Sequence, residues 1–221
     1  MRYQAASPDA RAIVYAGIQA DPLVKRVAGL LAGASRGQLV LARAVMNGER
    51  TESRIWRQMF PALFREPLVA GSEAILAACL EVAERGEQAR SQYRGAVVEQ
   101  LTEDLLARRS EAVRRERRVL FDGVAAEIHP YDVTVEVPGH GEVYDCKWGA
   151  RGINADVLHQ LDDARTHAAA EGEPLTVALV IFDARKSCEV RVSRLSAPAG
   201  QTRLFALESL QRLAGARPAS G

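Results

Sequence analysis

Residues 132–148, which read DVTVEVPGHGEVYDCKW, decide the fold of this chain. Valines alternate with polar residues over 132–137, a pattern typical of a strand with one buried face. Residues 138–141 (PGHG) supply turn chemistry, and the alternation resumes over 142–148. The stretch therefore predicts a β-hairpin with an aspartate at the start of its first strand and Asp-Cys-Lys near the end of its second.

The pairing of these two strands depends on the centre of the turn. If Gly139 and His140 form that centre, Asp132 lies opposite Lys147, and Asp145 lies diagonal to Asp132. Residues diagonal to each other across an antiparallel pair lie about 7–8 Å apart, so both carboxylates could reach one ion. A shift of one residue would move Asp132 to the opposite face of the sheet.

Two carboxylates and a lysine on one sheet face suit a divalent cation next to a phosphate. Mg²⁺ commonly takes one or two carboxylates, with water and substrate phosphate completing its shell. The backbone carbonyl of Cys146 could add an oxygen ligand, while its thiol is expected to point into the core. Lys147 would contact the scissile phosphate or orient the attacking water. Taken alone, Asp145 and Lys147 are better explained as an exposed ion pair on a solvated strand, because Asp-x-Lys is a common tripeptide.

The elements on either side of the hairpin define a wider order. Residues 87–118 predict one long helix with an apolar stripe, and Glu99 lies at the border of that stripe. Residues 156–170 predict a second helix, which carries Gln160. Residues 175–182 (LTVALVIF) form the apolar run expected of a strand buried on both faces. Strand, helix and strand in this order imply a right-handed crossover to a parallel neighbour.

Glu99, Asp132 and Asp145-Cys146-Lys147, in this order and spacing, resemble the motif of the PD-(D/E)XK, or restriction-endonuclease-like, nucleases. The resemblance covers about residues 90–183. It implies an α/β fold with an αβββαβ core, in which residues 118–126 would supply the first strand. It also implies hydrolysis of phosphodiester bonds with Mg²⁺, or Mn²⁺ in its place, and it favours DNA over RNA as the substrate.

The resemblance assigns roles to individual residues. Asp132 and Asp145 would be direct metal ligands, and Glu99 would hold the metal directly or through water. Lys147 would position the nucleophile or stabilise the phosphorane, and Gln160 would orient the lysine or the phosphate. The sequence departs from the family where Tyr131 replaces the proline of its name, and where no tyrosine follows Gln160 four positions on.

Arginines offer candidate phosphate contacts, although the net charge of +1 does not itself indicate a nucleic-acid-binding protein. Arg108, Arg109, Arg114 and Arg115 gather near the end of the first predicted helix, and Arg151 follows Lys147. A solvated helix end, whose arginines favour the negative terminus of the helix dipole, would explain the first four equally well.

Composition and length fit a globular protein of 221 residues with a sizeable core. No apolar stretch approaches the ~20 residues of a membrane span, and the N-terminus lacks a signal-peptide pattern. Cys79, Cys146 and Cys188 are isolated in the sequence, which favours a reduced, cytoplasmic setting.

The chain divides into three expected regions. Residues 1–86 form a mostly helical extension that could cap the sheet, dock a partner protein or bind DNA. Residues 87–196 form the nuclease-like core, which ends in an added edge strand over 188–195. Residues 197–221 supply a loop, a short helix over 204–213 and a tail.

Two other functions compete with a nuclease. One is a catalytically inactive subunit that keeps the fold and binds nucleic acid or a partner protein. The other is an enzyme of another class, such as a transferase with Cys146 as its nucleophile, although no histidine stands at a recognisable motif spacing from that cysteine. The sequence leaves open the strandedness of the substrate, internal or terminal cleavage, the pathway and self-association.

Overall fold

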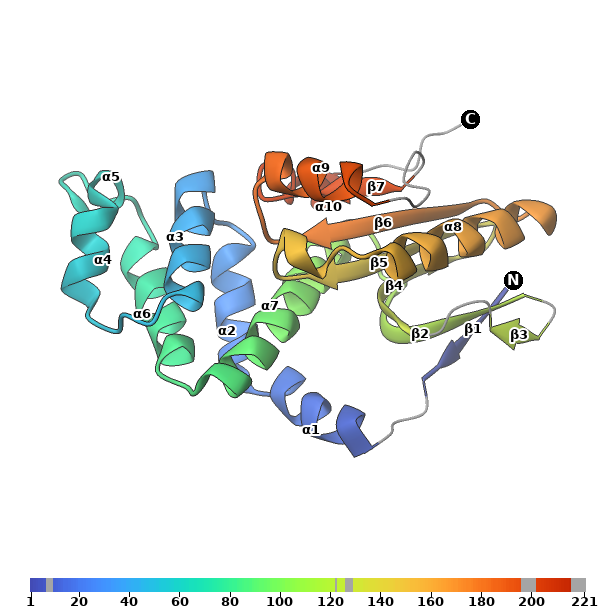
Figure 1. Ribbon diagram of the computed structural model, residues 1–221, viewed down its shortest axis with the longest axis horizontal. Helices are drawn as coiled ribbons and strands as arrows, with labels where there is room; N and C mark the ends of the chain where they lie inside the picture. Colours follow the sequence, from blue (N-terminus) through green and yellow to red (C-terminus); the bar gives the residue numbers. More distant parts are fainter. Residues whose placement is uncertain (7–9, 122, 126–128, 196–201, 216–221) are drawn as a thin grey trace. The chain divides into compact units, whose positions relative to one another are not determined.

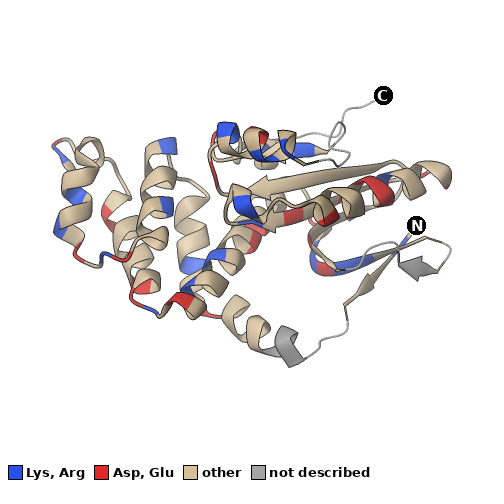
Figure 2. Cartoon of the chain, in the orientation of Figure 1, with Lys and Arg blue, Asp and Glu red and all other residues tan. Residues whose placement is uncertain are grey.

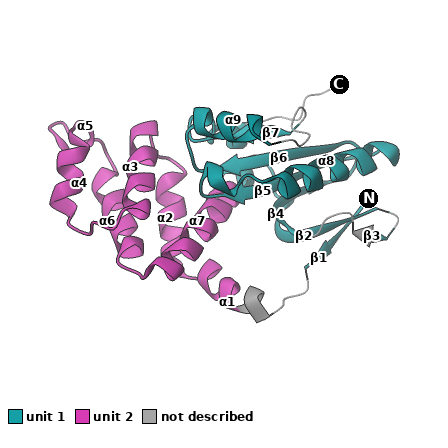
Figure 3. Ribbon diagram, in the orientation of Figure 1, with its two compact units in different colours: residues 1–8, 105–221 teal, residues 9–104 magenta. Residues whose placement is uncertain are grey.

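The computed structural model describes residues 1–6, 10–121, 123–125, 129–195 and 202–215. The chain separates into two compact units (Figure 3). Unit 1 contains Met1–Pro8 and Leu105–Gly221, and unit 2 contains Asp9–Asp104. These units do not coincide with the regions expected from the sequence, because the first residues of the chain belong with the sheet and residues 87–104, expected in the core, belong with the helical unit.

Unit 1 is built on a mixed sheet in which the described strands follow the order β1-β2-β4-β5-β6-β7, with β3 pairing to β2 (Figure 1). The strands from β1 to β5 pair antiparallel, whereas β5, β6 and β7 run parallel to one another. Their bounds are Arg2–Ala5 (β1), Val113–Phe121 (β2), Val124–Ala125 (β3), Tyr131–Val137 (β4), His140–Lys147 (β5), Leu175–Ile181 (β6) and Arg203–Phe205 (β7).

A crossover joins the parallel strands β5 and β6, as the order of elements predicted. The chain leaves β5 through the short 3₁₀ helix η1 (Ala150–Gly152) and returns through α8 (Ala155–Ala170). Asn154 caps α8, because its side chain accepts a hydrogen bond from Val157 N. The α/β class predicted from the sequence is confirmed.

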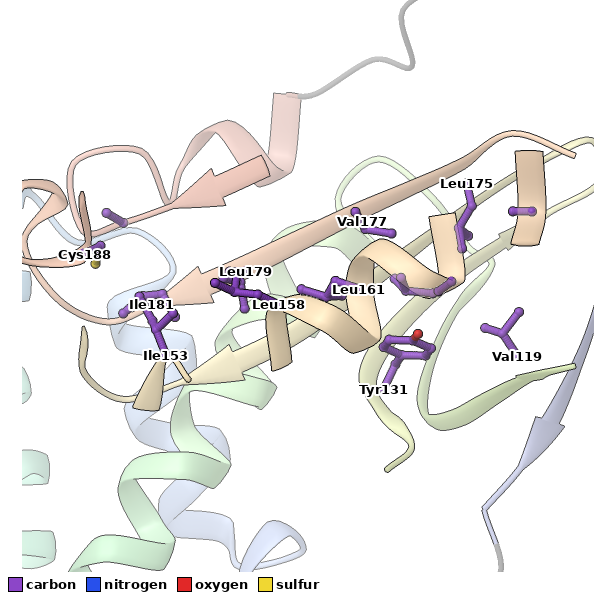
Figure 4. Packing of buried hydrophobic residues seen from close by; sticks show 14 of the residues in the cluster. Val119, Tyr131, Ile153, Leu158, Leu161, Leu175, Val177, Leu179, Ile181 and Cys188 are labelled. Atoms are coloured by element: carbon purple, nitrogen blue, oxygen red, sulfur yellow. The ribbon is translucent and has the colours of Figure 1, made fainter. Parts of the chain in front are cut away.

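The core of unit 1 lies between α8 and one face of the sheet (Figure 4). Leu158, Leu161 and Ala164 on α8 are buried, as are Val177 and Leu179 on β6. Burying side chains of this kind stabilises a fold by about 1.5–3 kcal/mol each, so this layer fixes the position of β5.

Unit 2 is helical in its described residues. Its helices are α1 (Ala10–Gln19), α2 (Pro22–Leu31), α3 (Arg36–Asn47), α4 (Ser53–Met59), α5 (Pro61–Phe64), α6 (Ser72–Ala83) and most of α7 (Glu87–Ala107). Asp21 caps α2, and Ser35 and Gln38 form a capping box at the start of α3. The mostly helical character expected of the N-terminal part of the chain is therefore confirmed for residues 10–83.

The first core helix is shorter than predicted. Helix α7 ends at Ala107, and Val113–Phe121 is a strand instead of the continuation of that helix. This strand pairs with β1 on one side and β4 on the other. The many arginines of this segment hid the alternation of apolar and polar residues that marks a strand. Hydrogen bonding to a neighbouring strand on each side outweighs the helix propensity of the segment. The predicted strand over 118–126 was therefore placed too late in the chain.

The C-terminal elements also differ from the prediction. Residues 188–195 were expected to form an edge strand, but Arg185–Ser193 is a helix, α9. The strand prediction required Cys188 and Val190 to share a buried face. In the helix, Cys188 is buried while Val190 is 42% exposed. The helix predicted over 204–213 is instead strand β7 followed by α10 (Arg212–Gly215). The loop predicted at 197–200 and most of the predicted tail lie outside the described residues.

Candidate active site at the β4–β5 fork

The β4–β5 hairpin has a different register from the predicted one. Val133 pairs with Tyr144 and Thr134 with Val143, so the two central turn residues are Pro138 and Gly139. Gly139 has a φ of 77°, and proline followed by a left-handed glycine is the preferred sequence of a type II turn. The predicted pairing of Asp132 with Lys147 is wrong by two residues, but an even shift leaves every side chain on its predicted face.

The two strands separate beyond the Val133–Tyr144 pair. β4 continues along β2 as far as the pair Arg117–Tyr131, and β5 continues along β6 as far as Lys147–Ile181. At the fork, Cys146 N donates a hydrogen bond of 2.6 Å to Asp132 Oδ2. A side-chain carboxylate thus accepts a hydrogen bond from β5 at the point where the β4–β5 ladder has ended.

The fork brings the two predicted carboxylates to one lysine. Lys147 Nζ lies 2.5 Å from Asp145 Oδ1 and 3.9 Å from Asp132 Oδ2. The side chains are partly screened from solvent, with exposed fractions of 12% for Asp145, 24% for Asp132 and 29% for Lys147. The prediction that Asp132, Asp145 and Lys147 converge is confirmed.

The charge state of Lys147 is set by its neighbours. Burial alone would lower the pKa of its ammonium group, but Asp132 and Asp145 outweigh burial, and the pKa is raised above its ordinary value. Lys147 therefore carries a positive charge throughout the neutral and mildly alkaline range. It is suited to stabilise an anion or orient a water molecule, and it is unsuited to act as a general base.

One carboxylate oxygen at the fork is buried and has a single cation beside it. Asp145 Oδ1 contacts the Lys147 ammonium at 2.5 Å, and among the described residues no backbone or hydroxyl group donates to it. A carboxylate oxygen can accept more than one contact, so it could take a further ligand. A hard cation that takes oxygen ligands fits this atom and the Asp132 carboxylate.

Two side chains at the fork, Asp132 and Asp145, could hold a metal ion. In the part of the chain that the structure describes, no group of three or more His, Cys, Asp and Glu side chains could hold a metal ion together. Glu99 belongs to unit 2, where it is 5% exposed and accepts hydrogen bonds from Tyr15 Oη at 2.5 Å and Gln19 Nε2 at 2.8 Å. Its role at the metal, like that of the Cys146 carbonyl, stays a prediction.

Gln160 makes a contact that the sequence did not suggest. Its amide nitrogen donates to the carbonyl of His129 at 3.0 Å, just before β4 begins. Tyr131 Oη also lies 3.5 Å from the Gln160 carbonyl, so α8 is linked to the start of β4. These contacts make Gln160 a support for the strand that carries Asp132, and a role in orienting Lys147 stays a prediction.

Cys146 is a poor candidate nucleophile in this environment. The residue is 5% exposed, in agreement with the prediction that its thiol points into the core. Reactive cysteines are usually accessible and lie beside a group that lowers their pKa.

The turn after β5 is held by Asp183, a residue that sequence reasoning missed. Asp183, just beyond β6, accepts a hydrogen bond from Ala150 N at 3.1 Å and another from Ala184 N at 2.7 Å. Phe182 N donates to the Lys147 carbonyl at 2.9 Å. The carboxyl ends of parallel strands gather functional side chains, and that rule could have drawn attention to Asp183.

Gly152 leaves no room for a side chain beside the lysine. A Cβ at this position would lie 3.0 Å from Lys147 Cβ and 3.1 Å from its Cγ and Cδ. The Gly152→Val variant is therefore expected to displace the Lys147 stem and lower any Lys147-dependent rate by about tenfold to 10²-fold, since small misplacements are costly in catalysis. A matched control is Gly86→Val, because a Cβ at Gly86 meets no atom within 4 Å. Equal rates for the two variants in an activity assay would contradict this account of the turn.

The arginines named as phosphate contacts fall into different environments. Arg108 and Arg151 are exposed, whereas Arg114 donates to the carbonyls of Glu111 and Val113. Arg115 lies on β2 in the pair Arg115–Val133, so these arginines do not form one cluster at a helix end.

The side chain of Arg109 has several partners within unit 1. Its guanidinium pairs with Glu142, donates to Tyr144 Oη at 3.0 Å and donates to the Leu213 carbonyl at 2.8 Å. The side chain is 13% exposed. These partners occupy both ends of the guanidinium fork, so the structure gives Arg109 a structural role, and its contact with nucleic acid stays a prediction.

Comparison of the chain with protein-family models, with curated proteins and with solved structures found no match in any of the three. None of the described helices is both long enough and apolar enough to pass through a bilayer.

Proposed function

We propose that the chain is a metal-dependent nuclease that hydrolyses phosphodiester bonds, with DNA as its substrate. The observation that carries this proposal is the fork itself, where the Asp145 and Asp132 carboxylates lie 2.5 and 3.9 Å from one charged lysine and Asp145 Oδ1 is buried. The described order α7, β2, β4, β5, α8, β6 supports it, because it follows the αβββαβ order of the nucleases that the sequence resembles.

Each side chain has a role that its position allows. Asp132 and Asp145 would hold Mg²⁺, which when bound would neutralise phosphate charge and make a water molecule more acidic. Lys147 would contact a non-bridging oxygen of the scissile phosphate, because its charge is maintained and its stem is fixed by Gly152. Exposed Arg151, four residues beyond Lys147, would contact the neighbouring phosphate of the backbone.

Metal dependence gives the first test. Purified protein is expected to cleave plasmid or linear DNA with Mg²⁺ or Mn²⁺, and EDTA should abolish cleavage because two carboxylates would then repel the phosphate unscreened. Calorimetry with Mn²⁺ alone measures the same site without activity, and Asp145→Asn should weaken that binding by about tenfold or more. Single-stranded DNA and RNA of the same sequence identify the substrate class.

The outcome of this test separates the nuclease from the inactive subunit. Nucleic-acid binding that ignores Mn²⁺ and EDTA, with no cleavage of any substrate, would refute the nuclease and favour the subunit that only binds. Cleavage that survives EDTA and is lost after thiol alkylation would instead favour chemistry at a cysteine.

A further inference from the structure

A corner of unit 2 carries apolar side chains that its own core does not use. Helices α4 and α5 meet at Phe60, and beside them lies a hollow of about 400 Å³. Met59 and Val40 are 57% and 41% exposed at this place. Val40, Met59, Phe60 and Pro61 are among the residues that line the hollow.

A second hollow of about 320 Å³ adjoins the first, because both include Pro61. Its lining is basic and contains Arg54, Arg57 and Arg65. Arg57 is held by Glu73, whereas Arg54 and Arg65 are exposed. We call the two hollows together the α3–α5 groove.

The segment that lines this groove is net positive. Residues 36–65 contain six arginines against two glutamates, a net charge of +4 in a chain whose total is +1. Helices α3 and α4 carry Lys or Arg and no Asp or Glu (Figure 2). A ligand that enters the groove therefore meets an apolar floor with positive charge beside it.

The groove walls are held firmly by the rest of unit 2. Leu39, Leu41 and Val45 of α3 are buried, as is Trp56 of α4. Trp56 Nε1 donates to the Arg50 carbonyl at 2.9 Å, and this bond fixes the loop before α4. Met59 and Val40 therefore stand on a rigid base, which lowers the entropy lost when a partner binds.

We propose that the α3–α5 groove binds an acidic amphipathic helix of a partner protein. Apolar side chains of such a helix, spaced three and four residues apart, would cover Met59 and Val40 in the 400 Å³ hollow. Its carboxylates would pair with Arg54 and Arg65 in the adjoining hollow. Methionine, aromatic residues and arginine are the side chains enriched at protein interfaces. Nucleic acid fits less well, since its phosphates gain nothing from the apolar floor.

The experiment uses a synthetic peptide of about 18 residues, long enough for five helical turns, with leucine and phenylalanine on one face and glutamate on the other. The full chain is labelled with ¹³C in its methionine and valine methyl groups. Peptide addition should shift the signals of Met59 and Val40, and raising NaCl from roughly 0.05 to 0.5 M should weaken binding. The proposal does not depend on nuclease activity, so it stands or falls separately from the proposed function.

Variants on the exposed side of the groove keep the fold and remove the two kinds of contact. Arg54→Glu with Arg65→Glu should weaken peptide binding by about tenfold or more, since each carboxylate then faces a like charge. Met59→Ser should weaken it by a similar factor, whereas Lys25→Glu, an exposed charge reversal outside the groove, should leave it unchanged.

Three results would overturn the proposal. The first is the absence of methyl shifts at millimolar peptide. The second is equal binding by wild type and both groove variants. The third is a DNA duplex that shifts the same methyl groups and competes with the peptide, which would make the groove a nucleic-acid surface.

Discussion

Replacement of Lys147 by alanine is expected to lower kcat for DNA cleavage by roughly 10²–10³, the effect of removing one donor that stabilises transition-state charge. The reason is geometric, because Nζ is the cation held at the fork by Asp132 and Asp145, with its pKa raised by both. The matched control is Lys186→Ala, an exposed lysine of the same unit, which should keep the wild-type rate. Single-turnover cleavage of a labelled DNA duplex measures the effect.

Loss of Asp145 should be as damaging for a different reason. Asp145→Asn keeps the shape of the side chain but removes the charge that attracts both a metal ion and Lys147. We expect Mn²⁺ affinity and cleavage to fall together, whereas Lys147→Ala should reduce cleavage and leave Mn²⁺ bound. The exposed Asp163→Asn variant controls for loss of one negative charge. Cleavage by either site variant at the wild-type rate would refute the assigned roles.

Local patterns were sufficient for the central elements of unit 1. Valine alternation over 132–137 predicted β4, and the apolar run over 175–182 predicted β6. The strand–helix–strand order then required β5 and β6 to be parallel, as they are. Each inference rests on periodicity and chain connection, which do not depend on distant contacts.

The neighbours of each strand and the hairpin register depend on contacts that the periodicity of the sequence does not reveal. The strand Val113–Phe121 is stabilised by β1 at the other end of the sequence, so its neighbour could not be anticipated locally. The hairpin register followed from the backbone preference of Pro138-Gly139, which was weighed too lightly against Gly139-His140. In α9, alternation of Val190 and Val192 suggested a strand, but the buried side chain is that of Cys188.

The sequence predicted the charged residues of the candidate site, but it did not predict the residues that hold them in place. Asp132, Asp145 and Lys147 could be named because alternate residues of a strand point to the same face of the sheet. The register error of two residues did not change these faces. Asp183 and Gly152 act through a backbone turn whose path a sequence does not reveal. Their positions are set by the crossover from β5 to β6.

The Arg109→Met variant tests whether Arg109 supports the fold or contacts phosphate. The Arg109→Met variant should lower the free energy of unfolding of unit 1 by about 3–5 kcal/mol, because it leaves Glu142 as a buried charge without its partner. Glu142 is 5% exposed and Tyr144 is 2% exposed, so water cannot replace the guanidinium readily. Burial and the Glu142 carboxylate also raise the pKa of Tyr144, so its hydroxyl stays protonated and donates a hydrogen bond to Glu142.

The measurement is urea unfolding followed by hydrogen exchange of the β5 amides, which localises the loss of stability to unit 1. Arg108→Met, the exposed neighbour, serves as the control and should change stability by less than about 0.5 kcal/mol. The double variant Arg109→Met with Glu142→Leu should recover most of the loss, since an apolar pair can replace a buried ion pair. If Arg109→Met instead left stability intact and weakened DNA binding, the buried network would be wrong and the arginine would be a phosphate contact after all.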